Sequence, residues 1–113
     1  MVADGSLLEK AVIRRSMIGL RSVIRAKTVI EESIVMGNDY FEGNPEPQGV
    51  PGLGIGKACQ IRKAIVDKNV RIGDNVQILN KKGIAHGEGK GYMIQNGIVV
   101  IEKNAVIPPG TII

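Results

Sequence analysis

The sequence contains few aromatic residues, and this scarcity limits the kind of core that the chain can form. Among its 113 residues there are no Trp, one Phe and two Tyr, although 43% of the residues are hydrophobic. Large rings usually dominate the core of a globular domain. The core here is therefore expected to be narrow and lined with aliphatic side chains. The hydrophobic fraction also excludes a disordered chain.

Cysteine and long apolar runs are scarce too, and each absence excludes a class of protein. Cys59 is the only cysteine, which excludes an intramolecular disulfide and favours a reducing compartment. No apolar run is long enough to span a bilayer, and no signal-peptide pattern is present. The formal net charge is +4, but the basic residues are not interleaved with aromatics. This argues against nucleic-acid binding and favours small phosphorylated or carboxylated ligands.

What the sequence does contain is an aliphatic residue that returns every six positions. Fifteen Gly and five Pro indicate turns at regular intervals between these residues. The aliphatic positions are Ile18, Ile24, Ile30, Ile55, Ile61, Val66, Ile72, Ile78, Ile101 and Ile107, with a looser series before them through Val2, Leu7 and Val12. A small residue follows four positions later in many repeats, at Ser16, Ser22, Thr28, Cys59, Ala105 and Thr111.

A period of six predicts a parallel β-helix, because neither the helical period of about 3.6 residues nor simple strand alternation sustains it. Six residues form a short strand and a turn, so three hexads close one triangular coil. Stacked coils then form three parallel sheets, with strands roughly 4.8 Å apart along the axis. One step, ending at Val66, is a residue short. We expect an all-β fold of about four coils, in a single domain over residues 1–113.

Two segments interrupt the repeat, near residues 37–54 and 80–93. The first contains Pro45, Pro47 and Pro51, and the second is rich in Gly and Lys. Neither segment has the apolar stripe of a helix, so both are expected to be loops ejected from a corner of the coil. Residues 1–5 already lie within the repeat, as we expect of a segment cut from a longer protein.

Residues 33–42, 54–57, 62–76, 91–101 and 109–113 carry a resemblance that is more specific than the repeat. They read SIVMGNDYFE, GIGK, RKAIVDKNVRIGDNV, GYMIQNGIVVI and PGTII. Together they resemble the C-terminal β-helix domain of ADP-glucose pyrophosphorylase (glucose-1-phosphate adenylyltransferase) of plant and cyanobacterial type, over essentially the whole chain. The resemblance implies a left-handed β-helix, an exception to the usual right-handed crossover. Both loops are shorter than expected in that family.

The resemblance implies a function as well. The family makes ADP-glucose from ATP and glucose 1-phosphate, with magnesium, for starch or glycogen synthesis. Its catalytic nucleotidyltransferase domain carries a Gly-rich phosphate loop, which has no counterpart in this sequence. The chain is therefore expected to hold no catalytic residue and no cofactor of its own. It is expected to contribute subunit contacts and part of the allosteric site at which 3-phosphoglycerate activates and phosphate inhibits.

The expected partners are copies of this chain or subunits of the same family, but not nucleic acid or a membrane. Exposed strands at both ends of a short β-helix favour such self-association. The resemblance implies the cytoplasm of a bacterium or the stroma of a plastid as the compartment.

The resemblance also singles out two lysines as ligands of the effector: Lys68, in residues 66–69 (VDKN), and Lys103, in residues 101–104 (IEKN). An ammonium group on a rigid coil suits phosphate and carboxylate. Further basic residues could add to the same positive field: Arg14, Arg15, Arg21, Arg25, Arg62, Lys63 and Arg71. The alternative interpretation is that outward lysines of a β-helix are simply solvated.

The remaining candidates favour structural explanations, so no catalytic or metal site is predicted. His86, the only histidine, lies in a Gly-rich segment and is expected to be solvated. Cys59 falls in the small inward position and is expected to pack in the core. Glu31 and Glu32 point to opposite faces of a strand and cannot share a proton or a metal. Residues 54–56 (GIG) are too short for a dinucleotide fingerprint and fit a turn better.

Two rival functions stay open at this point. A hexapeptide-repeat acyltransferase or carbonic anhydrase needs catalytic or zinc-binding histidines, and the single His86 argues against both. A non-catalytic scaffold, an engineered self-assembling repeat protein or an ice-binding β-helix needs no site. Regular outward Thr ladders would support ice binding, and the sequence has none.

Overall fold

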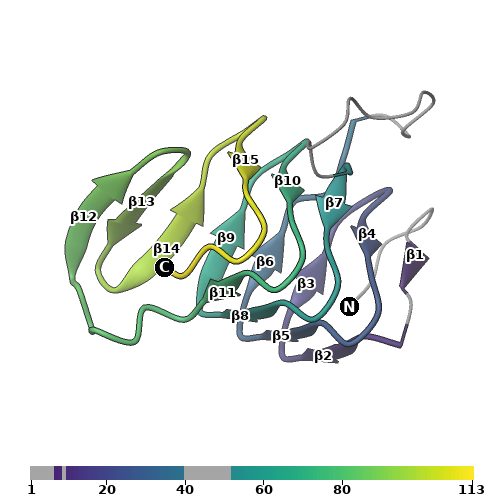
Figure 1. The fold of residues 1–113 in the computed structure, drawn as a ribbon, viewed down its shortest axis with the longest axis horizontal. Helices are drawn as coiled ribbons and strands as arrows, with labels where there is room; N and C mark the ends of the chain where they lie inside the picture. Colours follow the sequence, from purple (N-terminus) through teal and green to yellow (C-terminus); the bar gives the residue numbers. More distant parts are fainter. Residues whose placement is uncertain (1–6, 9, 40–51) are drawn as a thin grey trace.

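The computed structural model describes residues 7–8, 10–39 and 52–113, and in these ranges every regular element is a short strand. The strands form three sheets that wrap around one axis (Figure 1). The five-stranded sheet contains β1 (Leu7–Leu8), β4 (Val23–Ile24), β7 (Gly54–Ile55), β10 (Arg71–Ile72) and β15 (Val106–Ile107). The four-stranded sheet contains β2 (Val12–Arg14), β5 (Val29–Glu31), β8 (Gln60–Arg62) and β11 (Gln77–Ile78). The six-stranded sheet contains β3 (Met17–Ile18), β6 (Ile34–Val35), β9 (Ala64–Val66), β14 (Ile98–Ile101), β13 (Tyr92–Gln95) and β12 (His86–Gly89).

Outside the β12–β14 segment, successive strands along the chain belong to different sheets, and strands on adjacent coils pair in parallel. This is the connectivity of a parallel β-helix, as the six-residue period predicts. The number of complete coils depends partly on residues outside the described ranges, so the expectation of about four coils stays a prediction.

The coil is one residue shorter than three hexads. Residues stacked on adjacent coils are 17 positions apart, as the hydrogen bond from the Ser33 amide to the Ser16 hydroxyl shows. The corner residues with positive φ show which step is short. The step from Ala58 to Lys63 is one residue shorter than the steps from Lys63 to Asn69 and from Asn69 to Asn75. Each turn through the four-stranded sheet therefore takes five residues. The shortened step expected only before Val66 is in fact a regular part of the coil.

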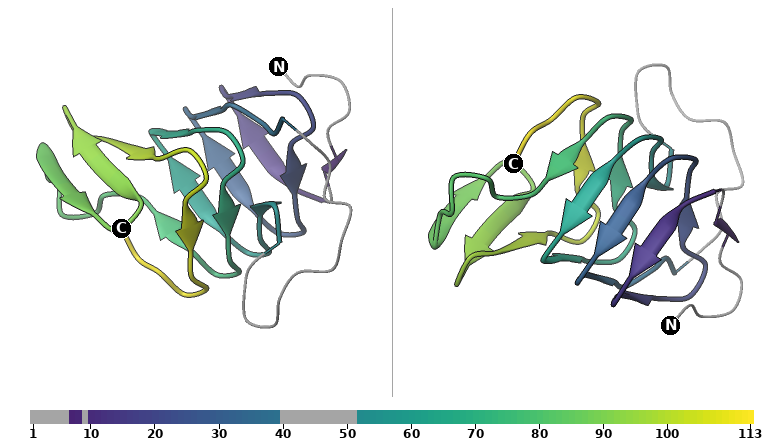
Figure 2. Two further views of the ribbon diagram at one scale, coloured as in Figure 1. Left: turned by 90° about the horizontal axis from the view of Figure 1, so that it is seen from above. Right: turned by 90° about the horizontal axis from the view of Figure 1, so that it is seen from below.

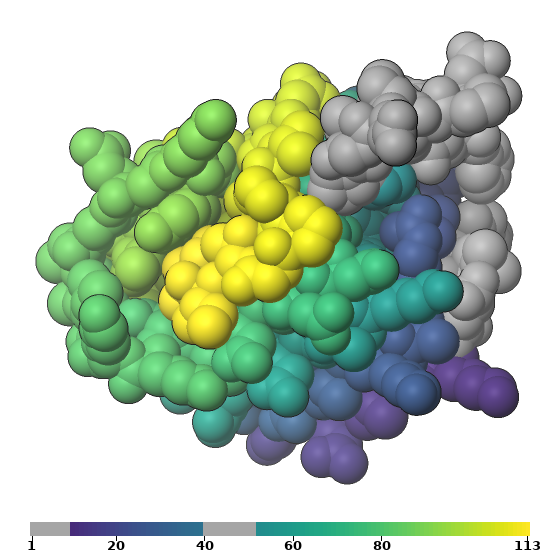
Figure 3. Space-filling model, viewed as in Figure 1, coloured from purple at the N-terminus to yellow at the C-terminus, as the bar shows by residue number. Residues whose placement is uncertain are grey.

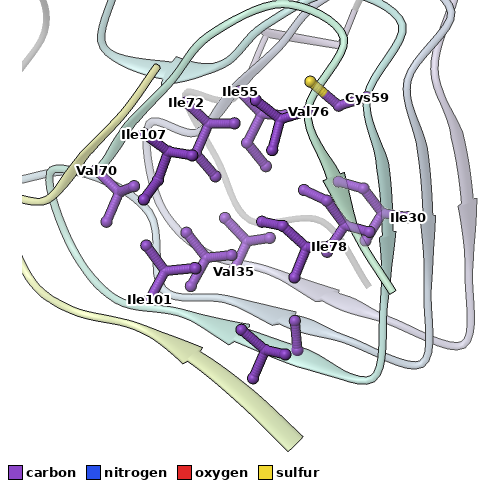
Figure 4. Close-up of a cluster of buried hydrophobic side chains, with 14 of the residues drawn as sticks. Ile30, Val35, Ile55, Cys59, Val70, Ile72, Val76, Ile78, Ile101 and Ile107 are labelled. Atoms are coloured by element: carbon purple, nitrogen blue, oxygen red, sulfur yellow. The ribbon is translucent and has the colours of Figure 1, made fainter. Parts of the chain in front are cut away.

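The interior of the prism is aliphatic, as the scarcity of aromatic residues predicts (Figure 4). Every member of the six-residue series from Ile18 to Ile107 is buried. The series before Ile18 is displaced by one residue in the structure. Val12 is exposed, whereas Ile13 pairs with Ile30 and packs against the core. Leu8, not Leu7, pairs with Ile24. Val2 lies outside the described residues.

The small inward position also links the coils. The Thr28 hydroxyl donates to the Gly56 carbonyl at 2.7 Å and accepts from the Cys59 amide at 3.1 Å. The Ser33 hydroxyl accepts from the Ala64 amide in the same way, also at 3.1 Å. No buried polar side-chain atom lacks a hydrogen-bond partner in the described part of the chain. Serine and threonine therefore fit this position both because they are small and because they satisfy backbone groups of the next coil.

The segment near 80–93 contains more regular structure than the predicted loop. Strands β12 and β13 form an antiparallel hairpin, and β13 pairs antiparallel with β14, which extends the six-stranded sheet beyond the last coil (Figure 2). Asn96 and Gly97 connect β13 to β14 with φ of 51° and 78°. These angles are typical of a type I′ turn, whose twist suits a two-residue hairpin. Of the segment near 37–54, residues 40–51 lie outside the described ranges.

Candidate functional site

The three edges where the sheets meet carry different residues. The edge between the six-stranded and five-stranded sheets consists of residues 19–22, 36–39, 67–70 and 102–105, and is called the lysine edge below. The edge between the four-stranded and six-stranded sheets includes residues 14–15, 31–32 and 62–63, and is called the paired edge. The third edge includes residues 25–27, 56–58, 73–75 and 108–110.

Lys68 and Lys103 occupy equivalent positions on consecutive coils of the lysine edge. The Asn104 amide donates to the Lys68 carbonyl at 3.0 Å, which stacks the turn carrying Lys103 directly on the turn carrying Lys68. Asn69 and Asn104 follow the two lysines with φ of 59° and 63°. Asparagine tolerates this left-handed conformation better than most residues. The repeated Lys-Asn pair therefore forms a tight corner with the lysine side chain on the outside.

Asp39 lies beside Lys68 on the preceding coil. The Lys68 ammonium is 3.3 Å from one oxygen of the Asp39 carboxylate, and the side-chain amide of Asn69 donates to the other oxygen at 3.1 Å. The Asn69 amide oxygen also accepts from the Asp39 backbone N–H at 2.9 Å. The side chains of Lys68 and Asp39 are 44% and 46% exposed, so solvent reaches both charges.

The pKa of Asp39 is lowered from its ordinary value of 3.8. The largest cause is the hydrogen bond from Asn69, followed by the hydrogen bond from Lys68, and the positive charge of Lys103 adds a smaller contribution. Both lysines therefore act electrostatically on one point of the surface. Among the described residues, Lys103 forms no ion pair of its own.

Buried amides support this corner from within. Asn38 and Asn69 are both buried. The Asn38 side chain donates to the Arg21 carbonyl at 2.7 Å, and the Arg21 Nε donates back to the Asn38 carbonyl at 3.0 Å. Gly37 stands where Lys68 stands one coil later, and a Cβ there would collide with the Leu20 backbone. The lysine edge is thus a hydrogen-bonded stack, with the charged ends of Lys68 and Lys103 at its surface.

Most of the arginines suggested for the positive field lie elsewhere. Arg14 and Arg15 belong to the paired edge, where they form ion pairs with Glu31 at 3.5 Å and Glu32 at 3.1 Å. Arg62 and Lys63 follow on the next coil of that edge, with Arg62 opposite Glu31. The guanidinium of Arg25 donates to the carbonyls of Leu53 and Ile55, both at 3.3 Å, and so supports the start of β7. Arg71 is part of β10, and Arg21 alone of this group belongs to the lysine edge.

The structure agrees with the structural interpretation of His86 and Cys59, whereas Gly54 and Ile55 form strand β7 and not the expected turn. His86 is exposed and pairs with Gln95 in the hairpin. The Cys59 thiol is fully buried and donates to the Gly73 carbonyl at 3.2 Å. Burial raises the pKa of this thiol, which makes it a poor nucleophile. Glu31 ends β5 and Glu32 lies at the corner with φ of 48°, so the expectation that they occupy opposite faces of a strand is wrong; both are partly exposed and pair with different arginines. No group of three potential metal ligands occurs within residues 7–8, 10–39 and 52–113.

Sequence reasoning missed two surface features. The first is a hollow of about 370 Å³ at the C-terminal end, lined mainly by the apolar side chains of Ile84, Tyr92, Ile94, Ile112 and Ile113, with Lys81 and Lys82 at its margin. In Figure 3 it lies between the green hairpin residues and the yellow C-terminal residues. The Asn96-Gly97 turn between two apolar runs was a signal for the hairpin that forms one wall.

The second feature is a ladder of apolar side chains on the outer face of the six-stranded sheet. The strand register places Met17, Ile34, Ile65, Val100 and Met93 in one row across five strands. Met17 and Ile34 are 54% and 40% exposed. Ile65, Val100 and Met93 are half-buried, so the row as a whole is partly exposed. A contiguous apolar row that solvent reaches usually marks a protein–protein contact. The outward positions of the four-stranded sheet hold mostly charged or amide side chains instead.

Comparison with known proteins gives consistent matches. The family model described as "GLGC left-handed parallel beta-helix domain" matches residues 1–112, which agrees with the left hand that the resemblance implied. The chain is 43% identical to the "Glucose-1-phosphate adenylyltransferase small subunit" of Zea mays over 122 aligned residues, which cover all of this chain and 97% of that sequence. No helix in the described part of the chain is long and apolar enough to cross a membrane.

Proposed function

Since the chain belongs to the C-terminal left-handed β-helix domain of ADP-glucose pyrophosphorylase, we propose that it is the regulatory and assembly part of a glucose-1-phosphate adenylyltransferase. In this role it does not itself catalyse the formation of ADP-glucose from ATP and glucose 1-phosphate. It binds a phosphorylated effector, 3-phosphoglycerate or inorganic phosphate, and holds subunits together. The compartment is the cytoplasm of a bacterium or the stroma of a plastid.

One observation carries the regulatory part of the proposal. Two lysines stack on consecutive coils, at a corner that is held by the hydrogen bonds of buried amide side chains. The hydrogen bond from Asn104 to the Lys68 carbonyl fixes this arrangement in the backbone. Two ammonium groups held on a rigid base suit an anion with several oxygens, such as a phosphate monoester with a neighbouring carboxylate. The lysine edge is therefore the effector half-site that this chain brings to the enzyme.

The magnesium that the family uses with ATP is assigned to no residue of this chain. Three of the described carboxylates are tied to other groups: Glu31 and Glu32 to arginines, and Asp39 to Lys68 and Asn69. The described residues also bring no three potential metal ligands together. This arrangement does not fit a divalent cation site, which prefers several oxygen ligands around one point.

The assembly part of the proposal is supported by the apolar ladder on the six-stranded sheet. Five aliphatic or thioether side chains in one row would be shielded from water by a copy of the chain or a subunit of the same family. Light scattering over a concentration series tests this: we expect a mass above that of a monomer. A monomeric mass at every concentration would contradict it.

A calorimetric titration with 3-phosphoglycerate at low ionic strength tests the effector site. We expect saturable binding by the wild type and loss of binding in the double variant Lys68→Ala plus Lys103→Ala. Lys27→Ala plus Lys57→Ala is the matched control, because these two lysines stand on consecutive coils of the third edge and their side chains are exposed. Equal loss in both double variants, or no binding by the wild type, would refute the proposed effector role.

A further inference from the structure

We propose that Asp39 is a tethered competitor that occupies the anion site formed by Lys68 and Lys103, and that it sets the affinity of this site for phosphate and carboxylate ligands. This inference rests on the proposed function, because it assumes that the lysine edge binds an anion. It concerns a different residue, however, and it predicts the opposite effect of mutation: removal of Asp39 strengthens binding, whereas removal of either lysine weakens it.

The contacts of Asp39 are those that a bound carboxylate would make. One oxygen lies 3.3 Å from the Lys68 ammonium, and the other accepts a hydrogen bond of 3.1 Å from the Asn69 side chain. Lys103 stands on the next coil and adds its positive charge at the same point. The site therefore already ligates an anion, and that anion is part of the chain.

Asn69 holds Asp39 in this place from two sides. Its amide nitrogen binds the carboxylate, and its amide oxygen accepts from the Asp39 backbone N–H at 2.9 Å. Asn69 is itself buried and fixed at the corner with φ of 59°. The position of Asp39 is thus determined by Asn69, on the coil that precedes Lys103. Asp39 is therefore not a freely rotating surface carboxylate.

The ion pair between Lys68 and Asp39 is nevertheless open to exchange. Both side chains are nearly half exposed, and exposed ion pairs are weak. A free phosphate can therefore draw the Lys68 ammonium away from Asp39 without any rearrangement of the backbone. The Asp39 charge then remains close to the bound anion and repels it, which lowers the affinity further. The Lys68 ammonium can therefore pair either with Asp39 or with a bound phosphate, but not with both at once.

A different role for Asp39 predicts a different result. If Asp39 served to position Lys68 for the ligand, its removal would leave the ammonium less ordered and would weaken binding. The sign of the change in affinity in Asp39→Asn therefore separates competition from positioning. Asparagine keeps the size of the side chain and its ability to bond to Asn69, so the substitution removes little more than the charge.

The experiment is a titration of the whole chain with inorganic phosphate at low ionic strength, followed by NMR of the backbone amides at the lysine edge. We expect Asp39→Asn to bind phosphate roughly threefold to tenfold more tightly than the wild type, with the gain shrinking as salt is added. Glu32→Gln is the matched control, because it removes the same charge from the paired edge. A gain below about twofold is expected for it, since that edge is remote and screened.

Each further outcome has a definite meaning. Unchanged or weaker binding in Asp39→Asn, with normal binding by the wild type, overturns the inference and leaves the proposed function intact. An equal gain in Glu32→Gln also overturns it, because net charge alone would then explain the effect. Absence of saturable binding in the wild type and in Asp39→Asn overturns the proposed function and the inference together. A gain that disappears when Lys68→Ala is combined with Asp39→Asn supports competition for that ammonium.

Discussion

The lysine edge and the paired edge of the prism are built on the same backbone register but distribute their charges differently. On the paired edge opposite charges stack: Arg14 lies over Glu31, and Arg15 over Glu32. The lysine edge also has an opposite-charge pair, between Asp39 and Lys68, but Lys103 then follows Lys68 on the next coil, so two like charges are stacked there. The paired edge also contains no counterpart of the buried amides of Asn38 and Asn69 among its described residues.

The difference teaches that the register of a β-helix sets which residues meet, while the sign of each charge decides what the edge can do. An edge of alternating charges neutralises itself and has little attraction for a dissolved ion. Two like charges on consecutive coils, as at Lys68 and Lys103, repel each other and gain most from an external anion. The hydrogen-bonded amides then keep the like charges in place against their repulsion.

The largest effect is expected from removal of the amide support. Asn69→Ala removes a buried side chain together with both of its hydrogen bonds to Asp39, and should lower the free energy of unfolding by about 1–3 kcal/mol. Lys63→Ala on the paired edge is the control, since Lys63 has a similar φ of 51° but is exposed. It should cost no more than about 0.5 kcal/mol. Urea unfolding measures both values, and equal losses would show that the amide stack is unimportant.

A charge reversal should make the lysine edge resemble the paired edge. Lys103→Glu places an opposite charge beside Lys68, and we expect phosphate affinity to fall at least about tenfold. Stability should change by less than about 1 kcal/mol, because the side chain is exposed. Isothermal titration calorimetry checks the affinity. Lys27→Glu on the third edge carries the same change of net charge, and a similar fall in that variant would argue against a localised site.

The smallest effect concerns acid stability. The folded-state pKa of Asp39 lies below its ordinary value of 3.8, so the carboxylate contributes stability at higher pH that is lost as the pH falls through the folded-state pKa. The wild type should therefore exceed Asp39→Asn in thermal unfolding midpoint by a constant amount above about pH 5, and this difference should shrink below about pH 4. A difference that stays constant down to about pH 2 would contradict the assigned interactions.

The sequence was sufficient to predict the architecture, because one physical pattern repeats along it. The aliphatic residues from Ile18 to Ile107 have to enter a narrow interior, and the structure confirms that they do. The displacement at Val12 was not predictable from hydrophobicity, since Val12 and Ile13 are both aliphatic and only strand register separates them. The five-residue step was hidden for a related reason: it recurs once per coil, and the two interruptions leave few coils in which to see it.

The two lysines could be named from the resemblance, but their surroundings could not. Asp39 and Asn69 are 30 positions apart and meet only because the chain between them closes a coil. No local spacing rule connects such residues, so the ion pair with Lys68 became visible only in the folded chain. For the arginines, sequence reasoning joined residues that the fold separates. Their common charge suggested one positive field around the two lysines, but Arg14, Arg15 and Arg25 lie on other edges of the prism.

The 17-residue offset between stacked residues has a consequence for how the chain tolerates insertions. At the two interruptions the offset rises to 31, between Ile34 and Ile65, and to 35, between Ala64 and Val99, yet the coils on either side stay in register. The entropy of closing a loop grows only with the logarithm of its length, so doubling the offset costs about 0.6 kcal/mol. A corner of this prism can therefore accept foreign segments of a dozen residues or more at little thermodynamic expense. Surface diversity can in this way evolve without any change to the aliphatic interior.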